Sequence, residues 1–100
     1  MATAAKSFIA TLRVKPEKLA TFIAAQTELK ALVATHEPDA LVYELLQSDE
    51  DETLFYCVAT FSDDAAFQHH MHIDFHDRLV PIILDCLAED MQLGFFKSLR

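Results

Sequence analysis

Residues 53–70 read Thr-Leu-Phe-Tyr-Cys-Val-Ala-Thr-Phe-Ser-Asp-Asp-Ala-Ala-Phe-Gln-His-His. The first nine are nearly all apolar, β-branched or aromatic, which predicts a strand in the centre of a sheet. Ser62 is a good N-cap, and Asp63 and Asp64 suit the first turn of a helix. We expect a helical region from there to about Leu87, in one piece or two, with Pro81 breaking it, kinking it or beginning its second part.

The flanking segments complete an α+β pattern. Residues 7–15 alternate as a strand does, and its apolar face consists of Phe8, Ala10, Leu12 and Val14. Helical spacing follows over residues 16–35, with proline in the first turn. Residues 41–47 and 91–98 are predicted strands, and the acidic residues 48–52 a solvated hairpin tip. The order βαββαβ predicts a ferredoxin-like fold, with an antiparallel sheet covered by helices on one face.

Composition narrows the function classes. The chain has 100 residues, which predicts one domain over residues 1–100. Hydrophobic residues make up 52%, slightly above the usual share of about 45–50%, which favours a second buried surface such as a dimer interface. The formal charge is −8, and no Lys/Arg cluster is present, so neither nucleic acid nor an anionic membrane is expected as a partner.

Targeting and cofactor motifs are also missing from the sequence. No apolar stretch is long enough to span a membrane, and no secretory signal is present. Cys57 and Cys86 lie in apolar segments, which indicates buried thiols in a reducing compartment and predicts a cytoplasmic protein. The only glycine is Gly94, so no phosphate-binding loop supports a nucleotide or flavin site.

Four of the five histidines lie within residues 69–76. On one continuous helix His69, His72 and His76 share a flank, and the last two have the i, i+4 spacing that binds zinc. The flank is therefore either a solvated or interfacial helix face or a metal site. A third reading is that one of these histidines lies in a pocket, and the resemblance described below favours His70 for that place. The opposite stripe, expected to face the core, consists of Phe67, Met71 and Phe75.

Three further side chains on predicted strands have two readings each. Tyr43 and Tyr56 are either core or sheet-face residues, or acid/base groups if their hydroxyls face a cavity. Arg13 either steadies an anionic intermediate or pairs with an acidic residue of a neighbouring strand.

Over about residues 7–97 the chain resembles the antibiotic biosynthesis monooxygenase family of small, dimeric, ferredoxin-like proteins. The strongest segment is 54–70, where Phe61 takes an aromatic position that is commonly tryptophan, Phe67 an anchor position, and His70 a histidine three residues later. Leu41-Val42-Tyr43 matches the start of the family's second strand. The acid common in the family two residues before the aromatic is Ala59 here.

The resemblance implies a dimeric α+β barrel and an oxygenation that uses no metal, flavin or haem. In such members a phenol or polycyclic aromatic loses a proton, gives an electron to O2 and becomes a quinone. It implies that His70 transfers the proton or stabilises the anion, in a pocket walled by Phe8, Tyr43, Tyr56, Phe61 and Phe67. The alternatives are a non-oxygenating binding protein or isomerase of the same fold, and a metal-binding protein that uses the histidine cluster.

Overall fold

The computed structural model describes residues 4–100. Its elements in chain order are β1 (Ala5–Arg13), the 3-10 turn η1 (Pro16–Lys18), α1 (Leu19–His36), β2 (Ala40–Gln47), β3 (Leu54–Phe61), α2 (Asp64–His72), α3 (Asp74–Asp85) and β4 (Gln92–Ser98). The predicted βαββαβ order is confirmed, with the second helical region divided in two.

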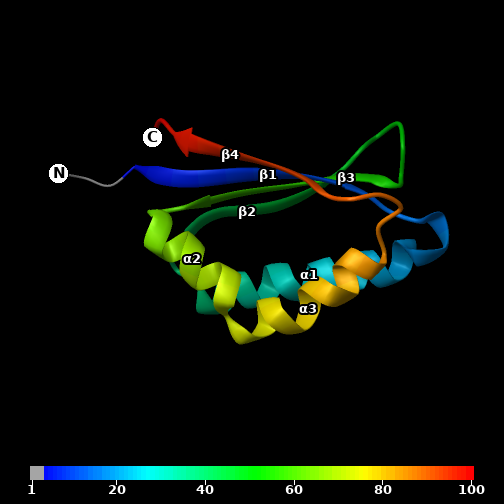
Figure 1. The fold of residues 1–100 in the computed structure, drawn as a ribbon, viewed down its shortest axis with the longest axis horizontal. Coiled ribbons are helices and arrows are strands. Elements are labelled where there is room, and N and C mark those ends of the chain that lie inside the picture. Colours follow the sequence, from blue (N-terminus) through cyan, green and yellow to red (C-terminus); the bar gives the residue numbers. More distant parts are fainter. Residues whose placement is uncertain (1–3) are drawn as a thin grey trace.

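The four strands form one antiparallel sheet in the order β2-β3-β1-β4. β3 is a central strand, as its nearly continuous apolar sequence predicted. All three helices lie on one face of the sheet, and the other face is open (Figure 1). The side chains of β1 predicted to share a face, Phe8, Ala10, Leu12 and Val14, are all buried. The core therefore lies between the sheet and the helices.

The helical break lies at Ile73, so the expectation that it falls at Pro81 is wrong. Ile73 has extended backbone angles, and its carbonyl accepts hydrogen bonds from the His76 and Asp77 amides, which begins α3. Pro81 lies inside α3, and its exposed ring leaves the helix continuous to Asp85. The break lets Phe67 on α2 and Phe75 on α3 each turn into the core.

The start of α2 is capped by Asp63, whereas the sequence suggested Ser62. The Asp63 carboxylate accepts a hydrogen bond from the Ala66 amide at 2.8 Å, which satisfies one of the unpaired donors of the first turn. This cap fixes where the helix that carries His70 begins.

Removal of this cap should weaken the fold measurably. We expect Asp63→Ala to lower the free energy of unfolding by about 1 kcal/mol, whereas Asp63→Asn, which keeps an acceptor oxygen, should stay close to the parent. Urea unfolding of the three proteins measures the difference. Equal stability of the alanine variant and the parent would contradict the assignment of the cap.

The open face of the sheet carries several large apolar side chains. Strand alternation and register put on this face Ile9, Leu46, Tyr56 and Phe96, which are 38%, 44%, 37% and 53% exposed. Extended apolar patches of this kind mark interaction surfaces in soluble proteins.

Two further sequence expectations concern thiols and membranes. Cys57 and Cys86 are both free and buried, as predicted. Within residues 4–100, no helix has the length and apolar character needed to cross a bilayer.

Candidate active site

A cavity lies between the sheet and the helices. Its volume is about 130 Å³, and its mouth is open to solvent. β1, β2, β3 and β4 supply one wall, and α1, α2 and α3 supply the other. Among the described residues that line it there is no Lys, Arg, Asp or Glu. The polar side chains on its wall are Gln26, Tyr43, Cys57, His70 and His76.

His70 is the most buried of these polar side chains, at 1% exposure. Its Nδ1 lies 2.9 Å from Oε2 of Glu37, whose side chain is 3% exposed. A carboxylate only accepts hydrogen bonds, so Nδ1 carries a proton and donates a hydrogen bond to Glu37. Glu37 caps the C-terminal end of α1, and Pro38 restricts its backbone to extended conformations. The pair therefore joins the end of α1 to the last turn of α2.

The other ring nitrogen of His70, Nε2, is not fully buried. Nε2 has no hydrogen-bond partner within residues 4–100. In these residues every polar side-chain atom that is fully shielded from solvent does have a partner, so Nε2 is not fully shielded. Nε2 must therefore keep access to the cavity that His70 lines. Phe61 and Tyr43 hold the ring from its sides, with ring centroids at 5.0 and 5.5 Å. This geometry presents one oriented nitrogen to a ligand.

The other titratable side chains on the wall are held neutral. Burial, and then the neighbouring Cys57 and Glu37, raise the pKa of Tyr43 far above its ordinary value. Burial raises the pKa of the Cys57 thiol to about 11. Burial, and then the nearby His70, lower the pKa of His76 to about 4. Near neutral pH the phenol and the thiol thus keep their protons and the His76 imidazole lacks its second one.

The depressed pKa of His76 predicts a pH-dependent stability. In the unfolded state His76 binds a proton near pH 6.5, whereas in the folded state it binds one only near pH 4. The contribution of His76 to the free energy of unfolding is therefore fully present above about pH 6.5 and is lost as the pH falls toward 4. Partial access of water screens the effect, and we expect a loss of about 1–2 kcal/mol. Urea unfolding at the two ends of this window measures it.

A pair of histidine variants isolates the contribution of His76. His76→Gln should flatten the pH dependence by that amount, because its side chain does not titrate. His69→Gln, which alters an exposed histidine, should leave it intact. The same pH slope in all three proteins would show that His76 does not cause it.

The structure brings four of the six predicted site residues to the cavity wall: Phe8, Tyr43, Phe67 and His70. Phe61 is fully buried and is not among the lining residues. Its ring packs at a tilt on His70 and edge-on against Phe67, with ring centroids 5.0 and 5.8 Å apart. The prediction that Tyr56 lines the pocket is wrong. Tyr56 pairs with Thr11 and Leu46 on the open face of the sheet.

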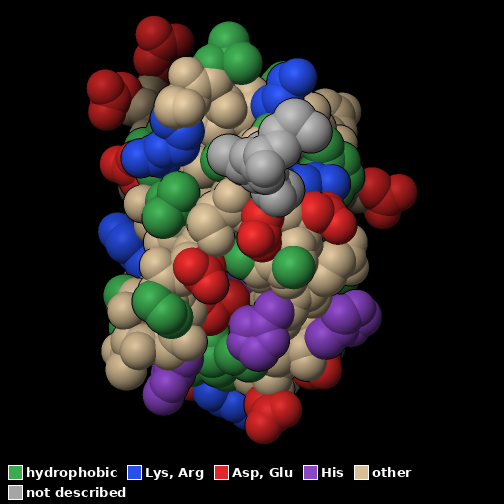
Figure 2. Space-filling view, turned by 90° about the vertical axis from the view of Figure 1, so that its left-hand side faces the viewer, with side chains coloured by type: hydrophobic (Ala, Val, Ile, Leu, Met, Phe, Trp, Pro, Cys, Tyr) green, Lys and Arg blue, Asp and Glu red, His purple; other side chains and the backbone are tan. Residues whose placement is uncertain are grey.

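The alternative metal site at His69, His72 and His76 required one continuous helix, and the break at Ile73 removes that premise. His69 and His72 are exposed on α2, whereas His76 turns inward on α3 and lies 4.6 Å from the His70 ring. The histidines on the face in Figure 2 form separate patches. No three His, Cys, Asp or Glu side chains of residues 4–100 are arranged to hold a metal ion. Met71, placed in the core stripe, is 37% exposed at the cavity rim.

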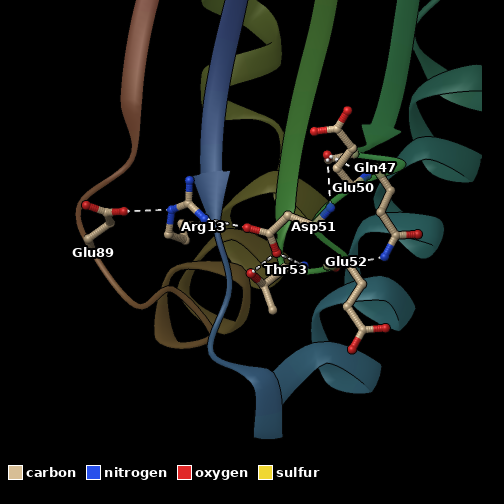
Figure 3. A network of polar contacts seen from close by, with 8 residues as sticks. Arg13, Gln47, Glu50, Asp51, Glu52, Thr53 and Glu89 are labelled. Carbon is tan, nitrogen blue, oxygen red and sulfur yellow. Dashed lines mark hydrogen bonds and ion pairs between the residues drawn. The ribbon is translucent and has the colours of Figure 1, made fainter.

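Arg13 takes the second of its two predicted roles. Its guanidinium pairs with Asp51 at 2.8 Å and Glu89 at 3.0 Å (Figure 3). Hydrogen bonds from Thr53, and then Arg13, lower the pKa of the Asp51 carboxyl. Arg13 is not among the residues that line the cavity.

The sequence did not single out Glu37 or Gln26. Glu37 follows no helical or strand period, and its partner His70 is 33 positions away. Its only local signal is its place between the end of a helix and Pro38. The resemblance led us to look for the acid on the strand, at Ala59; the carboxylate beside His70 comes from the end of α1 instead.

Comparisons with known proteins agree with the fold. The family model for antibiotic biosynthesis monooxygenases matches residues 7–80. A candidate antibiotic biosynthesis monooxygenase from Caulobacter crescentus CB15 has 24% identity and a TM-score of 0.93, covering 98% of this chain and 92% of that one. A second solved antibiotic biosynthesis monooxygenase has 25% identity and a TM-score of 0.86, with coverage of 95% and 99%. A candidate member from Nitrosomonas europaea has 19% identity and a TM-score of 0.90, with coverage of 99% and 94%.

The comparison with curated proteins gave no match. The matched residues, 7–80, make up most of the chain and include both Glu37 and His70. On this match the chain belongs to the antibiotic biosynthesis monooxygenase family.

Proposed function

We propose that the protein is a monooxygenase that oxidises a phenolic or polycyclic aromatic compound with O2 to a quinone, with the substrate itself as the reductant. One observation carries the proposal: a largely apolar cavity, with no charged side chain among the described residues that line it, holds the His70 imidazole, which the buried Glu37 carboxylate orients. An apolar wall suits a flat aromatic ligand and keeps water from reactive intermediates.

The reaction begins with proton transfer to His70. Nε2 accepts the acidic proton of an anthrone-like or phenolic substrate, and the Glu37 carboxylate at 2.9 Å from Nδ1 stabilises the imidazolium that forms. The substrate anion then gives one electron to O2, and the resulting radical and superoxide combine to form a carbon–oxygen bond. No metal or flavin is needed to supply the electron.

The second half returns the proton. The peroxide takes the proton from His70 and becomes a hydroperoxide, whose reacting carbon still carries one hydrogen. The hydroperoxide then loses water and leaves a new carbonyl group. The water consists of the outer oxygen with its proton and the remaining hydrogen of the reacting carbon. In sum, the ring methylene of an anthrone and one molecule of O2 give a carbonyl group and one molecule of water, and His70 ends in its starting state.

We further propose that the protein is a cytoplasmic homodimer. The apolar open face of the sheet, with Ile9, Tyr56 and Phe96 exposed, supports a second copy as its cover. The free, buried thiols support a reducing compartment. Light scattering should give twice the chain mass of 11.3 kDa; a mass of one chain would contradict the dimer.

Oxygen labelling tests the proposed reaction. The purified protein is incubated with anthrones and dihydroxynaphthalenes under 18O2, and product and oxygen uptake are measured together. We expect one O2 consumed per quinone and one labelled oxygen in the new carbonyl. If compounds of the panel bind but none of them is oxidised, the proposed oxygenase activity is wrong. That result would favour a non-oxygenating binding protein or isomerase.

A further inference from the structure

Gln26 is a buried polar side chain that the reaction above does not use. It lies on the face of α1 that packs toward the sheet and is 5% exposed. Buried amides are nearly always hydrogen-bonded, yet the Gln26 side chain has no hydrogen bond within residues 4–100. Every polar side-chain atom of these residues that is fully shielded from solvent has a hydrogen-bond partner. The unpartnered amide of Gln26 is therefore not fully shielded, and it is open to the cavity that Gln26 lines.

Gln26 on α1 and His70 on α2 both line the cavity, at separate points of its wall. Eleven residues of α1 separate Gln26 from Glu37, a distance of about 16 Å along the helix axis. Phe22, one turn before Gln26, packs on Phe55 at 4.7 Å, and Phe55 pairs with Leu12 of β1.

His70 lies by the other end of β1. The His70 ring packs at a tilt on Phe61, and Phe61 stacks on Phe8. Phe8 and Leu12 are four residues apart on β1, or about 13 Å. Gln26 lies one helical turn beyond Phe22 in the direction of Glu37, so Gln26 is nearer to His70 than this span.

We propose that Gln26 is a specificity-determining residue that binds a second oxygen of the ligand, at a point of the cavity wall apart from His70. The inference rests on the proposed function and narrows its substrate: an aromatic compound with a second oxygen function besides the one at His70. An amide both donates and accepts hydrogen bonds, so the second oxygen is a hydroxyl or a carbonyl. A carboxylate is disfavoured, because no cationic side chain of the described residues lines the cavity.

Two anthraquinones test the assignment by equilibrium binding. 2-Hydroxyanthraquinone carries a hydroxyl at one end and 2,6-dihydroxyanthraquinone at both ends, and both are already oxidised, so binding is read without turnover. Calorimetric titration compares the parent protein, Gln26→Leu and Leu29→Met. Leu29 lines the same cavity from the same helix, and methionine conserves its volume.

We expect the parent to bind the dihydroxy compound about five- to tenfold more tightly, which is the effect of one added hydrogen bond. Gln26→Leu should abolish this preference without weakening the monohydroxy compound, and Leu29→Met should keep it. Gln26→Leu should unfold at the same or higher urea concentration, since it removes an unpaired buried amide. That result separates loss of recognition from loss of fold.

The outcomes that overturn the inference are distinct from failure of the function. An unchanged preference in Gln26→Leu, or no preference in the parent, would overturn the role of Gln26 and leave the oxygenase standing. No binding of either anthraquinone by the parent would overturn the proposed pocket, and the role of Gln26 with it.

Discussion

Replacement of His70 by glutamine is expected to lower the turnover number for aromatic oxidation by about 10²–10⁴-fold, the usual contribution of a positioned acid–base group. Glutamine can still donate a hydrogen bond to Glu37, so the buried carboxylate stays paired and the fold is retained. It cannot accept the substrate proton as the imidazole does. Oxygen uptake at saturating substrate measures the loss.

A matched control separates chemistry from the general loss of a histidine. His69 neighbours His70 in sequence but is exposed, so His69→Gln should keep the parent turnover number. Binding of 2-hydroxyanthraquinone should change far less than turnover in the His70 variant. A folded His70→Gln protein with the parent turnover number would remove His70 from the reaction.

Replacement of Glu37 by glutamine should lower the turnover number by about 10²-fold. The amide is isosteric with the carboxylate but lacks the negative charge that stabilises the His70 imidazolium. It also fixes the ring less strictly, because an amide can donate to Nδ1 as well as accept from it. Glu37 is a positioning residue, so KM should change less than the turnover number.

The double variant shows whether the two residues act as a unit. His70→Gln with Glu37→Gln should be no slower than His70→Gln alone, because Glu37 acts only through His70. Glu28→Gln, on the exposed side of the same helix, where Glu28 pairs with Arg78, should keep the parent rate. Additive losses in the double variant would mean that Glu37 acts on the reaction by another route.

The strands could be predicted because each is fixed by a local, two-residue period. Residues 7–15 alternate between buried and exposed side chains, and the pattern alone identified the inner face. β3 is apolar on both faces, so its sequence indicated a central strand but not which side chains turn inward. That is why Tyr56 was misplaced, and only the register of β3 against β1 and β2 decides it.

The helical break and the histidine cluster depended on packing. Pro81 is the residue that most disfavours a helix interior, yet α3 continues through it and the chain bends at Ile73. Burial of Phe67 and Phe75 from two short helices outweighs the local preference. The same bend turns His76 inward and away from His69 and His72, which no single-helix period could predict.

The pocket histidine could be identified from sequence, but its partner could not. His70 stood out through the segment it shares with the family, whereas Glu37 lies in an irregular connection and pairs with His70 only after the ends of α1 and α2 meet. Gln26 likewise has the helical spacing of a core position. Its open amide is a property of the cavity and not of its sequence neighbours.

The crystal structure of the protein bound to 2,6-dihydroxyanthraquinone tests the central claim most directly. We predict that the ring system lies in the cavity between sheet and helices, with one hydroxyl within hydrogen-bond distance of His70 Nε2 and Nδ1 still on Glu37. A ligand bound on the surface, or in the cavity with no polar contact to His70, would contradict it.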